Sequence, residues 1–189
     1  MPDPTLSEAL AEAYASAPSD MALIETMSFW YDGLMVDGEP SEIYIYQGFE
    51  GDRTSAEGVP LKDFVLEPAA RYFGGQQVEF VAIPFTVVLP QVSAGQLAKG
   101  QLIVDGVGRE IADVLMDAVA AGQSIEVTYR AYIEGMEADG PQNDPPIVFA
   151  LQGIQVNAVQ VRGDITAINV GNKRFPADIY RPARFPALR

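Results

Sequence analysis

Residues 101–133 read "QLIVDGVGREIADVLMDAVAAGQSIEVTYRAYI", and this stretch decides the fold. It opens with a short apolar strand at 101–105 and turns through Gly106 and Gly108 into a run with helical spacing. The apolar face of that helix carries Val107, Ile111, Val114, Leu115, Ala118 and Val119. Gly122 stands where a helix C-cap belongs, because glycine accepts the left-handed backbone found there. The stretch therefore predicts a strand, a packed helix and a second strand.

The second strand of this unit alternates strictly between 123 and 133, with the period of a β-strand. One face carries Ile125, Val127, Tyr129, Ala131 and Ile133, and the other carries Glu126, Thr128, Arg130 and Tyr132. We therefore expect the helix to lie between two strands of the same domain.

Further strands are predicted on both sides of this unit. The stretches are 21–30, 41–49, 61–67, 76–92, 147–157 and 158–169, and Pro84 marks a bulge, an edge or a bend. Segments 31–40, 50–60 and 134–146 are predicted to be turns and loops. A short helix is expected to begin near Ser7 and to end at Pro18.

These elements predict an α+β, β-rich fold. We expect a mostly antiparallel β-sandwich or split barrel with one packed helix and a short N-terminal helix. The predicted domain spans 1–169, and residues 170–189 form an extended basic, aromatic tail.

The composition excludes several classes of chemistry. The chain has 189 residues, 48% of them hydrophobic, which suits one domain with its own core. It contains no cysteine and no histidine, so disulfides, thiol nucleophiles, Cys/His zinc sites and a Ser-His-Asp triad are impossible. No apolar run is long enough for a membrane span, and the N-terminus lacks the pattern of a secretory signal. We expect no enzyme activity, cofactor, metal or membrane anchor.

Two local patterns each have a functional and a structural interpretation. The glycines of "GVG" at 106–108 match part of a dinucleotide-binding motif, but the third glycine would fall at Ile111, so a tight turn is the preferred interpretation. The loop 137–144 groups oxygen donors of the kind that calcium takes, although their spacing is not that of an EF-hand. These donors are Glu137, Asp139, Asn143 and Asp144. The alternative is a solvent loop stiffened by proline.

Charge is divided unevenly along the chain. Residues 1–161 contain 6 basic and 24 acidic side chains, a net charge of −18, whereas residues 162–189 have a net charge of +4. In the tail, Phe175 and Phe185 each follow an arginine and precede a proline, which favours extended backbone. The candidate interaction residues are Lys173, Arg174, Phe175, Tyr180, Arg181, Arg184 and Phe185. The tail either lies on the acidic body of a neighbouring subunit or covers its own core.

Five stretches, taken together, resemble the DUF1833 family of phage and prophage proteins. They are "EAYASAPSDMALIETMSF", "FTVVLPQVSAGQLAKGQLIVDGVGREIADVLMDA", "IEVTYRAYIEG", "GPQNDPP" and "NKRFPADIYRPARFP". Members of this family are typically encoded among genes for long, non-contractile phage tails. The strand-helix-strand segment is also similar to that of tail-tube-like proteins.

The resemblance implies a structural protein at the distal end of the tail, which forms a ring that joins the tail tube to the tip or hub. By analogy the ring is a hexamer, made in the host cytoplasm and incorporated into the virion. Its partners would be its own copies and the tail tube, tape measure and tail-hub proteins, while DNA passes through without specific binding.

Two rival functions stay open. One is a virion glycan hydrolase that uses paired carboxylates, and the other is a carbohydrate-binding module for host attachment. The only tryptophan, Trp30, stands in a predicted strand, where core packing is expected.

Overall fold

The computed structural model describes residues 22–36, 38–56, 58–90, 99–106, 109–157 and 160–167. The predicted N-terminal helix and the C-terminal tail lie outside these ranges. The strands are β1 (Leu23–Trp30), β2 (Met35–Val36), β3 (Glu39–Pro40), β4 (Ile43–Tyr46), β5 (Arg53–Thr54), β6 (Pro60–Val65), β7 (Gln77–Ala82), β8 (Phe85–Val88), β9 (Gly100–Asp105), β10 (Ile125–Ile133), β11 (Ile147–Val156) and β12 (Gln160–Ala167). The helix α2 (Arg109–Ala120) follows β9, and a single 3-10 turn, η1 (Glu137–Asp139), follows β10.

Ten of these strands form one sheet in the order β5-β6-β7-β4-β1-β10-β11-β12-β9-β8. Neighbouring strands are antiparallel except β4 and β7, which pair in parallel. β5 and β8 end the sheet and do not pair with each other, so the barrel is open. The predicted α+β, β-rich and mostly antiparallel fold is confirmed.

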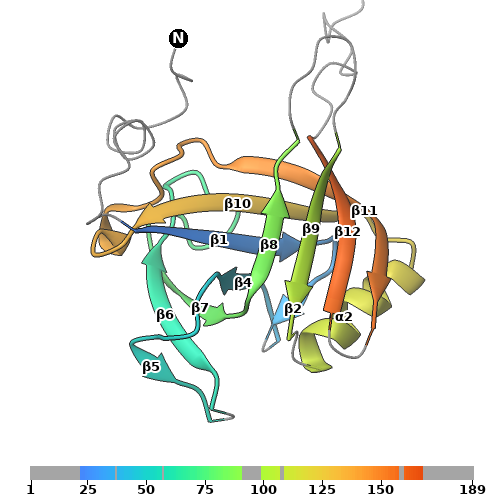
Figure 1. Cartoon of the computed structure of the whole chain (residues 1–189), viewed down its shortest axis with the longest axis horizontal. Coiled ribbons are helices and arrows are strands. Elements are labelled where there is room, and N and C mark those ends of the chain that lie inside the picture. Colours follow the sequence, from blue (N-terminus) through green and yellow to red (C-terminus); the bar gives the residue numbers. More distant parts are fainter. Residues whose placement is uncertain are drawn as a thin grey trace, which may run out of the picture.

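The sheet folds over both faces of its middle strands. In Figure 1, β8, β9 and β12 cross steeply over β1 and β10, while β5 and β6 lie at the other end of the molecule. A register shift between Gln152 and Gln155 interrupts the pairing of β11 with β12, and such a bulge increases the local bend of a sheet.

As a result, the described part of the chain forms two hydrophobic cores. In the first core, alternate residues of β1 and β10, such as Met27 and Val127, pack with β9 and with α2. In the second core, the ring of Phe64 lies 4.8 Å from that of Phe80 and 4.7 Å from that of Tyr132. Tyr132 belongs to the opposite face of β10, so this strand is covered on both sides.

Most of the predicted strands are present, with two kinds of difference. The short strands β2, β3 and β5 form in segments predicted to be turn and loop, and Pro84 separates β7 from β8. On α2 the predicted inward residue Val119 is 42% exposed, whereas Ala112 is buried beside Leu115 and Ala118. The prediction was wrong at Val119, which stands in the last turn of α2, one residue before the helix ends.

Candidate functional site

A buried ion pair joins the middle of β10 to the segment that follows β6. Arg130 binds Glu67 through two hydrogen bonds, from Nε to Oε2 at 2.8 Å and from Nη2 to Oε1 at 2.9 Å. Its Nη1 donates to Oγ of Ser28 on β1 at 2.8 Å. Arg130 is 2% exposed and Glu67 is 6% exposed. This two-pronged geometry satisfies a charge that burial would otherwise penalise heavily.

The groups around Arg130 and Tyr44 shift the pKa of both side chains. Burial alone would lower the pKa of Arg130, but the hydrogen bond and the charge of Glu67 outweigh burial, so the pKa lies above its ordinary value. Burial, followed by the charge of Glu42, raises the pKa of Tyr44. Within the described part of the chain, the Tyr44 hydroxyl and Oε2 of Glu42 are buried without a hydrogen-bond partner. The cluster is therefore cationic at Arg130 and neutral at Tyr44.

The loop between β6 and β7 covers this cluster and is fixed at several points. The Leu66 amide donates to the Gln76 carbonyl at 3.0 Å, which closes the base of the loop. The Arg71 guanidinium lies 3.5 Å from the centre of the Trp30 ring and 2.6 Å from Glu126. Arg71 thus occupies one face of the only tryptophan, which would otherwise be the natural platform for a sugar ring.

A second loop, 134–146, is fixed to β6 and β10 by polar contacts. Lys62 of β6 lies 2.9 Å from Oε1 of Glu137. Oδ1 of Asn143 accepts a hydrogen bond from the Ala131 amide at 2.9 Å, and its Nδ2 donates to the Tyr129 carbonyl at 3.1 Å. The Asn143 side chain therefore takes the place of a neighbouring strand beside β10.

Burial alone would raise the pKa of Glu137. The hydrogen bonds from Lys62 and from the Gly135 amide outweigh this effect and lower the pKa. Two of the four oxygen donors that suggested calcium, Glu137 and Asn143, are thus engaged with protein groups. Over the described ranges, no group of three or more acidic residues is placed to hold a metal ion.

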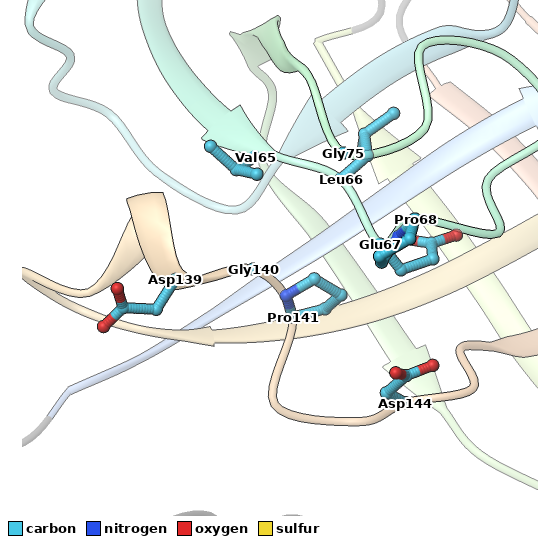
Figure 2. A pocket seen from close by; sticks show the side chains of 9 residues that line it. All are labelled: Val65, Leu66, Glu67, Pro68, Gly75, Asp139, Gly140, Pro141 and Asp144. Carbon is cyan, nitrogen blue, oxygen red and sulfur yellow. The ribbon is translucent and has the colours of Figure 1, made fainter.

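A pocket of about 180 Å³ lies between these two loops. Figure 2 shows the residues that line it: Val65, Leu66, Glu67, Pro68, Gly75, Asp139, Gly140, Pro141 and Asp144. Its volume is well below the roughly 300 Å³ at which small-molecule sites begin. The pocket is the right size for a single side chain, with apolar walls and exposed carboxylates beside them.

The structure does not describe the candidate interaction residues predicted from the sequence. Lys173, Arg174, Phe175, Tyr180, Arg181, Arg184 and Phe185 all lie outside the described residues. Sequence analysis in turn missed the pairing of Arg130 with Glu67. The available signal was a lone arginine between large apolar residues in "TYRAYI", which requires an acidic partner if both strand faces are buried.

Within the described ranges, no helix is long and apolar enough to cross a membrane. A search of curated proteins found no match to this chain. A family model described as a domain of unknown function, DUF1833, matches residues 60–180. The match includes both loops of the pocket and every strand from β6 to β12. Because it covers more than half of the chain, the protein belongs to the DUF1833 family.

Proposed function

We propose that this protein is a structural subunit of a long, non-contractile phage tail. It forms a ring at the distal end that joins the tail tube to the tip or hub. The sequence resemblance described above supports this role, and the distribution of charge along the chain is the observation that carries it.

Most basic side chains in the described part of the chain form ion pairs with acidic side chains of the same domain. Ion pairs engage Arg53, Lys62, Arg71, Lys99 and Arg130, and each has an acidic partner within the described ranges. Because residues 1–161 carry a net charge of −18, the body keeps a large excess of negative charge after this pairing. The opposite charge is concentrated in residues 162–189.

Such a molecule is complementary to another copy of itself. A basic tail that meets an acidic body joins two different surfaces, and head-to-tail contacts of this kind close into rings. Within the described ranges β5 and β8 each pair with one strand only, and such edge strands offer backbone groups for contacts with neighbours. An acidic ring would also let duplex DNA pass without binding its phosphates.

Light scattering over a wide range of concentration and salt, with electron microscopy of the assembled fraction, tests this proposal. We expect rings with a central channel, which weaken as salt screens the contact. The variant Arg184→Glu should reduce assembly. The matched variant Arg162→Glu should not, because Arg162 is exposed on β12 and precedes the tail 170–189.

A protein that stays monomeric at every concentration and binds neither tail tube nor hub proteins would overturn the proposal. Equal loss of assembly in both variants would instead overturn the role given to the tail.

A further inference from the structure

We propose that the pocket between the two loops binds Phe175 of the same chain, with Arg174 placed against Asp144. The segment Arg174-Phe175-Pro176 would then tie the C-terminal tail to its own domain. This inference concerns contacts within one subunit and does not depend on the proposed assembly into rings.

The chemistry of the pocket fits an arginine-phenylalanine pair. Val65, Pro68 and Pro141 provide apolar surface for a ring. Both carboxylate oxygens of Glu67 accept hydrogen bonds from Arg130, so the charge of Glu67 is already compensated. Asp144 is exposed and forms no ion pair within the described ranges, so its carboxylate is available. Figure 2 shows Asp139 and Asp144 on either side of Pro141.

The length of the chain allows this contact within one subunit. Ala167, the last described residue, pairs with Phe149 of β11, and paired residues of antiparallel strands lie about 5 Å apart. Asp144 precedes Phe149 by so few residues that their separation is at most about 18 Å. The stretch from Ala167 to Arg174 spans about 23 Å when extended, which is enough to reach Asp144.

Two segments of the tail share the pattern Arg-Phe-Pro, and the bounds of the family match favour the first of them as the occupant of the pocket. The family match ends at residue 180, beyond the last described strand, and includes Arg174-Phe175-Pro176. It excludes Arg184-Phe185-Pro186. In addition, proline disfavours helix at the residue before it, so Pro176 favours extended backbone at Phe175. The first motif therefore falls within the family match, and the second falls outside it.

Disulfide trapping in the full chain tests this inference, since the natural sequence contains no cysteine. The test variant combines Asp139→Cys at the pocket with Ala177→Cys, which leaves Arg174-Phe175-Pro176 intact. The matched control keeps Asp139→Cys and places the second cysteine at Ala187 instead of Ala177. Ala187 follows Arg184-Phe185-Pro186 just as Ala177 follows Arg174-Phe175-Pro176. A second control pairs Ala177→Cys with Met116→Cys, which is exposed on α2. The fraction of cross-linked monomer is measured by gel mobility and by mass spectrometry.

We expect the test variant to cross-link within the monomer at least about tenfold faster than either control, as a raised effective concentration requires. Adding Phe175→Ala should remove this advantage, whereas adding Phe185→Ala should preserve it. Equal rates in all three pairs would overturn the inference. Cross-linked dimers in place of cross-linked monomers would also overturn it, since the tail would then occupy the pocket of a neighbour.

Discussion

The side chain of Arg130 carries a full positive charge beside the second core, and its hydrogen bonds explain why this charge can be buried. Three of its nitrogen atoms donate hydrogen bonds, two to Glu67 and one to Ser28. The two-pronged contact fixes the loop between β6 and β7 over β10. Burying a pair of this kind gives little net stability compared with apolar residues, but breaking it leaves one charge uncompensated.

We predict that Glu67→Gln lowers the free energy of unfolding by about 3–5 kcal/mol, because Arg130 loses its counter-charge inside the protein. The exposed pair of Lys99 and Asp164 provides the control, and Asp164→Asn should cost at most about 1 kcal/mol. Urea unfolding of the three proteins measures the difference.

A double variant separates the charge from the shape of the site. Arg130→Met combined with Glu67→Leu should recover most of the stability lost in Glu67→Gln, because no charge stays buried. If Glu67→Gln unfolds at the same urea concentration as the natural protein, the pair does not carry the role assigned to it.

The sequence predicted β10 as a strand but not what covers its second face. Strict alternation is typical of a strand with one buried face, and Arg130 and Tyr132 fell on the more polar set. In the structure both are buried, because β6 and β7 fold over that face through the parallel pairing of β4 with β7. A contact between segments so far apart leaves no local pattern at the acidic side, so Glu67 could not be identified as the partner of Arg130.

At the scale of elements, α2 shows how closely periodicity can locate a buried face. The apolar residues of this helix span a wide arc, and the pattern alone does not give its centre. Packing against the sheet selects Ala112, Leu115 and Ala118. The helix itself and its end near Gly122 were predicted correctly, since Gly122 adopts a φ of +69°.

We predict that Leu115→Ala lowers the free energy of unfolding by about 2–5 kcal/mol, because it opens a cavity in the first core. Val119→Ala removes a side chain that is largely in solvent and should change stability by less than about 0.5 kcal/mol. Thermal unfolding followed by circular dichroism compares the two. A larger effect at Val119 than at Leu115 would show that the last turn of the helix is packed more closely than the structure has it.

For the whole molecule, the central fact is that two cores share the same strands. β1, β4 and β10 contribute one face to each core, as Ile45 and Tyr46 show for β4. The fold class and the position of most strands were predictable from local patterns. The order of strands in the sheet was not, because it depends on pairings such as β1 with β10 that join distant parts of the chain.

Shared strands predict that the two cores unfold together. Trp30 is the only tryptophan and lies under the β6–β7 loop, so its fluorescence reports the region of the second core. Far-ultraviolet circular dichroism reports the whole sheet. We expect the two signals to give one coincident transition in urea. Phe64→Ala, in the second core, should lower the stability by about 3–5 kcal/mol and move both signals together.

The alternative is a second core that opens while the first stays folded. Tryptophan fluorescence would then change at lower urea than circular dichroism, and Phe64→Ala would shift the fluorescence transition alone. That result would mean that β5, β6 and β7 form a separate unit held by the short parallel pairing of β4 with β7. A single transition in both proteins would instead show that β1, β4 and β10 couple the pocket and its loops to the rest of the sheet.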